Sequence, residues 1–341
     1  MTPGTGLVQR CARRVRCALP GAALLLAVSG ASAQSAGQPL VLEAKIALGA
    51  VSGRIDHLAI DLKRRRLFVA ELGNDSLGVV DLATRKLLRT IAGLKEPQGV
   101  GYEASTDTIY VANAGDGSVH ILRGEDFAPL RRIELGNDAD NVRIDAMHRR
   151  VMVGYGDGAL AIIDPASRAK IGDVRLPAHP EAFQLVENGT QAVVNLPDAH
   201  QIDIADLASG TVHRVPTGAL AANFPMAIDA PAHRSLVAFR SPPMLAAFTI
   251  PAGHLAARLP ICADADDVFV DVKRHRIYVS CGAGVIDVLE PAADGYARLA
   301  QMPTVSGART SLFVPELDRL FVAAPAGWSE PAAIWVFRPT P

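Results

Sequence analysis

The chain has 341 residues and a formal net charge of −1, with 49% hydrophobic and 20% charged residues. That length suffices for one large domain or two ordinary domains with a sizeable buried core. Aromatic residues are scarce at 5%, whereas 29 glycines and 23 prolines indicate many short strands joined by tight turns, and the near-neutral charge excludes a polycationic nucleic-acid binder.

Residues 1–33 have the features of a secretory signal peptide. Four arginines precede a short apolar run at 18–29, and Ala31, Ser32 and Ala33 form a small-x-small cleavage site. The run is too short to span a bilayer, which disfavours an uncleaved anchor. Without this segment, 30 basic and 35 acidic residues remain, a net charge of −5. We therefore expect a periplasmic or secreted protein, cleaved near Ala33, without membrane insertion and without a nucleic-acid partner.

From residue 34 onward the sequence repeats with a period of 42 residues. Seven apolar segments end at Asp61, Glu103, Asp145, Glu187, Asp229, Asp271 and Pro315, with five spacings of 42 and a last one of 44. Each segment is followed by a second apolar strand, a Gly/Asp turn and two further strands, as in residues 66–93. Four antiparallel strands in such a unit are one propeller blade, whereas a β-sandwich has no comparable repeat.

The sequence therefore predicts an all-β fold, a seven-bladed β-propeller that forms a single domain over 34–341. Its blade entries are expected near 56, 98, 140, 181, 224, 266 and 310. The last repeat has only three strands, at 311–315, 319–324 and 332–338. Residues 40–49 supply a spare strand, and pairing it into the last blade would close the ring and remove an exposed sheet edge. The acids that end the inner strands, such as Asp61, are expected to bond the turn that follows.

Two cysteines remain outside the predicted signal peptide. Cys262 lies just before the inner strand of the sixth repeat, and Cys281 ends the strand next to it. Antiparallel pairing brings both to one face, and a disulfide persists in an exported protein. The sequence therefore predicts a Cys262–Cys281 disulfide. The absence of a CxxC spacing disfavours a redox role for these thiols.

The repeats also resemble a known family. YVANAGDGSVHIL at 110–122 resembles the YVTN-type propeller repeat. The chain from about 40 to 340 resembles the YncE-like family of exported bacterial propellers through EPQGV (96–100), DADNVRID (138–145), HPEAFQL (179–185), NFPMAID (223–229), DADDVF (264–269) and GARTSLFVPELDRL (307–320). This resemblance implies the fold and export. It implies no activity, because similar propellers include lactonases, amine-dehydrogenase subunits and cofactor-free binding proteins.

The residues at the start of each inner strand are the candidates for a functional site, because the blade entries of a propeller converge on one mouth of the channel. They are Asp56, His57, Gln98, Asp140, Asn141, His179, Glu181, Asn223, Asp266, Asp267, Arg309 and Thr310. Four carboxylates among them are candidate ligands of Ca²⁺ or another hard divalent cation, namely Asp56, Asp140, Glu181 and Asp266. Alternatively, these groups only cap strand ends and hydrogen-bond neighbouring blades through water.

We expect a monomeric binding or interaction protein that recognises a small polar ligand, a metal ion or a periplasmic protein partner at this mouth. The alternative is a metal-assisted hydrolase or lyase of lactone-like substrates that uses Asp140, Glu181, Asp266 or His57, since clustered carboxylates raise one another's pKa. A third reading is an accessory subunit of a periplasmic redox system. The sequence assigns no catalytic residue and no cofactor beyond the divalent cation.

Overall fold

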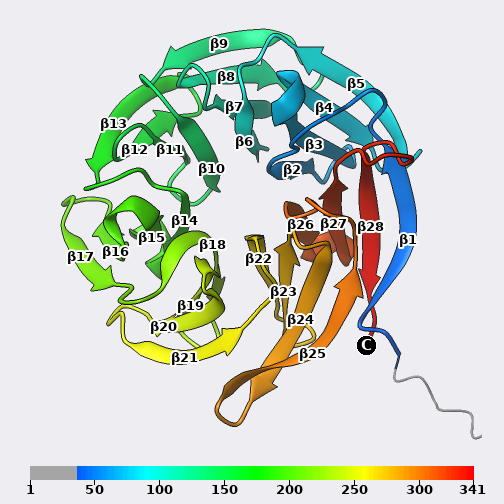
Figure 1. Cartoon of the computed structure of the whole chain (residues 1–341). Helices are drawn as coiled ribbons and strands as arrows, with labels where there is room; N and C mark the ends of the chain where they lie inside the picture. The colour runs from blue at the N-terminus through cyan, green and yellow to red at the C-terminus, as the bar shows by residue number, and fades with distance from the viewer. Residues whose placement is uncertain (1–36) are drawn as a thin grey trace, which may run out of the picture. The chain divides into compact units, whose positions relative to one another are not determined.

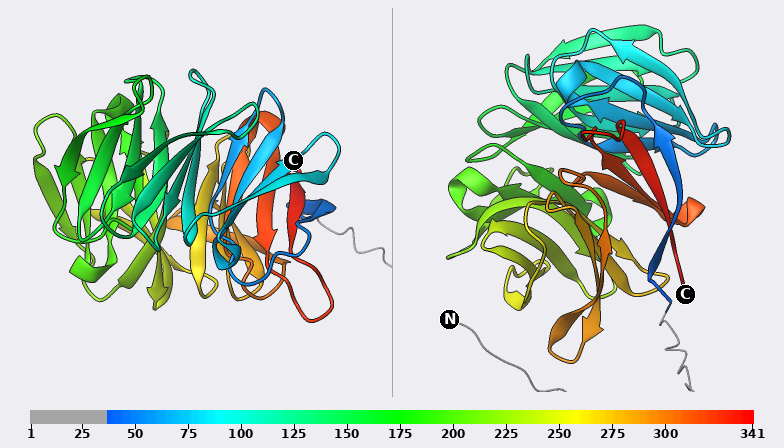
Figure 2. Two further views of the ribbon diagram at one scale, coloured as in Figure 1. Left: turned by 90° about the horizontal axis from the view of Figure 1, so that it is seen from above. Right: turned by 45° about the vertical axis from the view of Figure 1, so that its right-hand side comes forward.

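The computed structural model describes residues 37–341, in which 28 β-strands are joined by turns. Seven four-stranded antiparallel sheets surround a central axis (Figure 1). Viewed from the side, the blades stand next to one another around the ring (Figure 2). The predicted all-β fold with seven blades is confirmed, while the predicted signal peptide lies outside the described residues. No helix in residues 37–341 is long and apolar enough to cross a bilayer.

The strand nearest the axis comes first in every blade, and the chain then steps outward. The inner strands are β2 (Leu58–Asp61), β6 (Pro97–Glu103), β10 (Ala139–Asp145), β14 (Ala182–Val186), β18 (Ala221–Asp229), β22 (Ala265–Asp271) and β26 (Ser311–Val314). The second strands are β3 (Arg66–Glu71), β7 (Thr108–Asn113), β11 (Arg150–Tyr155), β15 (Gln191–Leu196), β19 (Arg234–Ser241), β23 (Arg276–Cys281) and β27 (Arg319–Ala324). Because all inner strands run in the same direction, their first residues meet at one end of the axis.

The two outer positions of each blade complete the sheets. The third strands are β4 (Ser76–Asp81), β8 (Ser118–Arg123), β12 (Ala159–Asp164), β16 (Gln201–Asp206), β20 (Pro243–Thr249), β24 (Val285–Ala292) and β28 (Ala333–Pro339). The outermost strands are β5 (Lys86–Ala92), β9 (Pro129–Glu134), β13 (Ala169–Arg175), β17 (Val212–Pro216), β21 (Leu255–Pro260), β25 (Gly295–Pro303) and β1 (Leu40–Ala47). Single 3-10 turns occur at η1 (Leu72–Asn74), η2 (Glu187–Gly189), η3 (Pro197–Ala199) and η4 (Pro315–Leu317).

The hydrophobic core is divided among the spaces between blades. Seven clusters of buried apolar side chains each combine residues of two neighbouring blades. The second and third strands are apolar on both faces because each face packs against a different neighbour; every residue of β7 is buried, for example. The space between the last blade and the first is filled in the same way, by residues such as Leu48, Leu67 and Phe321.

The N-terminal strand completes the last blade, as predicted. β1 pairs antiparallel with β28 from Leu40 opposite Pro339 to Ala47 opposite Ala333. Figure 1 shows the two strands side by side at the point where the chain begins and ends its circuit. The sheet of the last blade is therefore built from both ends of the described chain, and no blade lacks its fourth strand in residues 37–341.

The acids at the ends of the inner strands bond the turns that follow. The Asp61 carboxylate accepts the backbone N–H of Arg64 at 3.1 Å, and Asp145 accepts that of His148 at 3.1 Å. Glu103 accepts two backbone N–H groups in the same way, from Ser105 and Thr106. The predicted turn-fixing role of these acids is thus confirmed, and it leaves them without a role at the opposite mouth.

Arginines in two of these turns also reach the next blade. Arg274 pairs with Asp271 of its own turn at 2.9 Å and with Asp318 of the following blade at 2.7 Å. The guanidinium of Arg274 holds the pKa of Asp318 down at about 2. Arg64 makes the corresponding pair with Asp107 at 2.8 Å. These contacts tie neighbouring blades together on the face opposite the strand starts.

Cys262 and Cys281 are joined by a disulfide with a Cα–Cα distance of 5.9 Å. Both residues are buried in the cluster between the fifth and sixth blades. The bond connects the loop that precedes β22 to the last residue of β23. It therefore anchors the stretch of chain that leads to Asp266 and Asp267 at the axial mouth.

Candidate functional site

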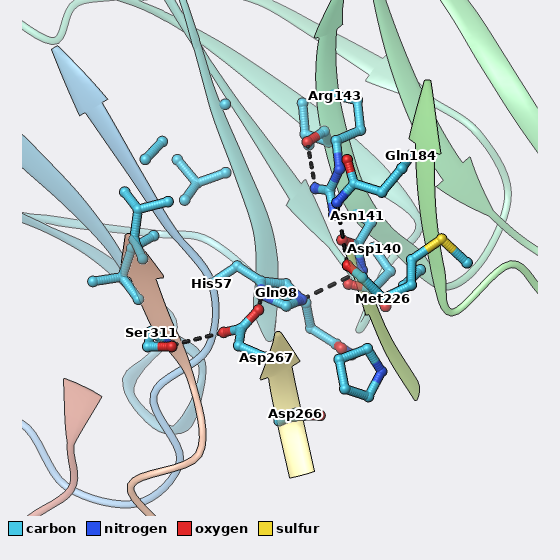
Figure 3. A pocket seen from close by; sticks show the side chains of 18 of the residues that line it. His57, Gln98, Asp140, Asn141, Arg143, Gln184, Met226, Asp266, Asp267 and Ser311 are labelled. Carbon is cyan, nitrogen blue, oxygen red and sulfur yellow. Dashed lines mark hydrogen bonds and ion pairs between the residues drawn. The ribbon is translucent and has the colours of Figure 1, made fainter. Parts of the chain in front are cut away.

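A cavity of about 330 Å³ lies on the axis and is lined by residues of all seven blades. The polarity of its wall changes along the axis. At the starts of the inner strands it is polar, and beyond them the wall is formed largely by apolar side chains such as Leu58, Val100, Val142, Met226 and Leu312. Figure 3 shows the polar groups gathered from several strands toward a common space. Polar groups at one end of an otherwise apolar pocket are typical of a ligand site.

Seven of the twelve predicted mouth residues line this cavity: His57, Gln98, Asp140, Asn141, Glu181, Asp266 and Asp267. The other five lie around it rather than in its wall. Asn223 donates its side-chain N–H to the carbonyl oxygen of Gln201 at 3.0 Å, and Thr310 donates its hydroxyl to that of Ile55 at 3.1 Å. These two residues connect neighbouring blades, which matches the structural alternative for them.

Backbone bulges explain why adjacent residues in one strand both reach the cavity. In a regular strand successive side chains point to opposite faces. The pairing of β10 with β11 shifts register between Ala139 and Val142, and that of β22 with β23 shifts between Ala265 and Asp267. Each irregularity spans mouth residues, so Asp140 and Asn141 line the cavity together, as do Asp266 and Asp267. Bulges commonly re-aim side chains in this way next to functional sites.

Asp266 is neutralised by arginines from three other blades. Arg240 of β19 contacts its carboxylate directly, Arg309 lies at 3.1 Å and Arg54 at 3.8 Å. The same two arginines Arg240 and Arg309 also pair with Asp264, at 3.3 Å and 2.9 Å. Because Asp266 is only 7% exposed, these pairs offset the cost of burying its charge. This half of the mouth is a closed ionic network that joins the first, fifth, sixth and seventh blades.

The opposite half of the mouth carries two acidic groups that form no ion pair in the described part of the chain, although the charge of Arg54 acts on both and that of Arg240 acts on Glu181. Within residues 37–341, Asp140 and Glu181 form no ion pair, and Asp140 is only 3% exposed. Burial and the charge of Glu181 raise the pKa of Asp140 well above its usual value. Burial and the charges of Asp266 and Asp56 raise the pKa of Glu181 to about 8. A positively charged ligand group or a metal ion placed here would relieve this unfavourable electrostatic environment.

His57 lies between the two halves of the mouth. Its Nε2 is 3.3 Å from the Asn141 side-chain nitrogen, and its Nδ1 is 3.9 Å from the Asp267 carboxylate. Burial lowers the pKa of His57, which favours the neutral imidazole. Asn141 also donates to the backbone carbonyl of Glu181 at 2.5 Å, and Asp267 accepts the backbone N–H of Ser311 at 2.7 Å. His57 is thus the centre of an arc of polar contacts from the seventh blade to the fourth.

Four charged residues of the site lie outside the predicted set, namely Arg54, Arg143, Arg240 and Asp264. Arg240 and Asp264 were missed because one lies next to the end of a second strand and the other precedes the inner strand of its blade. Arg143 lies farther along β10, where it donates to the carbonyl oxygens of Phe183 and Val142, both at 2.9 Å. Burial lowers the pKa of Arg143. An arginine at a channel-facing position between the apolar residues Val142 and Ile144 was the sequence signal that could have found it.

The fold and the axial cavity define a seven-bladed β-propeller of the kind commonly used for binding or interaction. No protein-family model and no curated protein matches the sequence.

Solved structures resemble the chain in fold. A chain of the Kuenenia stuttgartiensis hydrazine synthase is 16% identical with a TM-score of 0.71, and the match covers 83% of this chain and 95% of that one. A chain of a mitotic checkpoint complex is 13% identical with a TM-score of 0.75, covering 94% and 99%. The WD40 repeats of RRP9 are 8% identical with a TM-score of 0.74, covering 87% and 97%. At such identities the likeness extends to the fold alone.

Proposed function

We propose that this protein is an exported binding protein of the YncE-like, YVTN-repeat type, which takes a small polar ligand with a cationic group into the axial cavity. The observation that carries this proposal is the pairing of a cavity whose wall is partly apolar with a mouth whose acids Asp140 and Glu181 form no ion pair within residues 37–341. The volume of about 330 Å³ fits a small molecule. The cationic group would lie at the acids, and the remaining part of the ligand would contact the apolar wall.

Ligand binding can be tested with amines of increasing charge against the purified chain. We expect at least one of lysine, putrescine and spermidine to bind with a dissociation constant of about 1 mM or below, which is about −4 kcal/mol. Gln184→Trp places a bulky side chain in the cavity from β14 and leaves both acids in the sequence, and it should weaken binding at least tenfold. Gln301→Trp places the same side chain on the exposed strand β25 and should leave binding unchanged. The proposal would be refuted if the chain binds citrate but none of the amines. It would also be refuted if the Gln184→Trp and Gln301→Trp variants bind the amine equally well.

Export is the second part of the proposal. The signal-like segment at 1–33 supports it, and so does the Cys262–Cys281 disulfide, because such bonds persist in oxidising compartments. Fractionation of expressing bacteria should place the protein in the periplasm or the medium, with Gln34 as its first residue. A cytoplasmic protein that retains Met1 would contradict this localisation.

Metal-assisted hydrolysis of a lactone-like ring is the second candidate function. It is favoured by the convergence of two carboxylates without arginine partners, Asp140 and Glu181, with His57 on one cavity. Incubation with γ- and δ-lactones in the presence of Zn²⁺ or Ca²⁺ would release acid, which a pH-stat measures directly. Acid release that Asp140→Asn abolishes would favour the enzyme. Ligand binding without acid release would leave the binding protein.

A further inference from the structure

Three potential metal-binding side chains meet at the rim of the mouth, and they differ from the four carboxylates that the sequence suggested. Asp140 lies in β10, while His179 and Glu181 lie just before β14. One donor atom from each residue lies within 4.8 Å of the other two. Metal bonds to nitrogen and oxygen are about 2.1 Å long, so one ion can bridge donors at this spacing with a shift of about 1 Å.

The Asp140 carboxylate has a buried oxygen atom that lacks a hydrogen-bond partner within residues 37–341. The side chain is 3% exposed, and its Oδ1 atom has no hydrogen-bond partner among the described residues. A buried carboxylate oxygen without a partner is costly, and such groups are normally satisfied by a protein group, a water molecule or an ion. The Glu181 carboxylate likewise forms no ion pair within residues 37–341. Two acceptor groups therefore face one position that offers them no protein donor.

The contacts of His179 fix the tautomer of its neutral ring. Its Nδ1 lies 2.8 Å from the backbone carbonyl oxygen of Gly156 and 3.6 Å from the Asp138 carboxylate. Both neighbours are acceptors, so in the neutral imidazole the proton lies on Nδ1 and Nε2 carries the lone pair. A backbone carbonyl that fixes the tautomer of a histidine in this manner is the usual outer partner of a metal-binding imidazole.

The remaining acids of the mouth are engaged elsewhere. Asp266 is held by Arg240 and Arg309, and Asp56 lies 2.7 Å from Arg54. Of the four carboxylates suggested as calcium ligands, only Asp140 and Glu181 form no ion pair with an arginine within residues 37–341.

We propose that Asp140, His179 and Glu181 bind one first-row divalent transition-metal ion, with Zn²⁺ as the favoured ion. One imidazole nitrogen with two carboxylates suits zinc, manganese or iron, whereas Ca²⁺ takes six to eight oxygen ligands. Because Asp140 and Glu181 also line the axial cavity, the open coordination positions face it. The metal site does not require the small ligand proposed above, and because both would use Asp140 and Glu181, the ion and a cationic ligand compete for these carboxylates.

Isothermal titration calorimetry with zinc alone tests this site. The full chain, stripped with a chelator and then dialysed, should bind one Zn²⁺ per chain with a dissociation constant of about 1 µM or below and should bind Ca²⁺ at least 100-fold more weakly. His179→Ala and Glu181→Gln should each weaken zinc binding at least ~100-fold, because the loss of an outer partner alone already costs 10- to 100-fold. His213→Ala removes an exposed histidine of β17 and should have no effect.

Circular dichroism of the metal-free variants controls for folding, and Co²⁺ gives an independent readout. Cobalt bound by these donors should show visible absorption bands that His179→Ala abolishes in a folded protein. The proposal would be overturned by a lack of stoichiometric zinc, or by zinc that both folded variants bind as tightly as the wild type. Calcium bound more tightly than zinc would also overturn it, because it would assign the site to oxygen ligands only. Zinc binding without amine binding would leave the metal site intact and remove only the proposed ligand.

Discussion

A single methyl group at Gly99 should separate two blades at the mouth. A Cβ atom on this residue of β6 would lie 2.0 Å from the carbonyl oxygen of Asp140 and 2.8 Å from its carbonyl carbon. Ordinary contacts begin at 3.4 Å, so the Asp140 backbone would have to retreat by more than an ångström. The backbone of one blade cannot move away freely, because the blades form a closed ring. We therefore expect Gly99→Ala to lower the free energy of unfolding by about 3 kcal/mol, the upper part of the range for overpacking.

Gly172 provides a matched control for this substitution. It lies in the outermost strand β13, and the nearest atom to an added Cβ would be the Ile162 Cδ1 at 3.9 Å. Gly172→Ala should be neutral or stabilising by about 0.5 kcal/mol, since alanine restricts the unfolded chain more than glycine does. Guanidinium unfolding followed by far-ultraviolet circular dichroism measures both variants. Equal midpoints for the two, or a less stable Gly172→Ala, would refute this account of blade contact.

Two further predictions concern stability. Replacing both Cys262 and Cys281 by alanine opens a cross-link of 19 residues and should lower the unfolding free energy by about 3 kcal/mol; denaturant unfolding that equals that of the oxidised wild type would contradict this. Arg274 lowers the pKa of Asp318 to about 2. This ion pair should add about 1 kcal/mol to the free energy of unfolding above pH 4, and the contribution is lost as the pH falls toward 2. The stability difference between wild type and Asp318→Asn should therefore vanish at low pH, and a difference independent of pH would rule out this pair as its source.

The repeat made the architecture predictable. A fixed spacing of 42 residues between turn acids such as Asp61 and Asp145 gave the number of blades, because each acid occupies the same turn in its own blade. The missing fourth strand of the last repeat also gave the pairing of β1 with β28, since an unpaired sheet edge is unfavourable. Local hydrogen bonding and strand periodicity are repeated seven times, so the sequence carries this information redundantly.

The partners of the mouth residues were less predictable. An alignment of inner strands places Asp140 and Asp266 at equivalent positions, yet Asp266 is neutralised by Arg240 and Asp140 has no such partner. Arg240 belongs to a second strand, and its reach across to the next blade depends on rotamers and blade twist that the repeat does not encode. The orientation of His179 likewise depends on the carbonyl of Gly156, a backbone contact without a sequence signal. The sequence thus located the mouth, and the pairing of its charges came from the structure.

The sheet that β1 shares with β28 also sets the order in which the molecule is completed. β1 is synthesised before the other described strands, yet its hydrogen-bonding partner β28 is the last of these strands to be synthesised. The six other blades are each continuous in sequence, so they can assemble before β1 has a strand with which to pair. A circular permutant that joins Pro341 to Gly37 and opens a loop between two other blades would convert this sheet into one with consecutive strands. It would keep every native contact while changing which blade forms last.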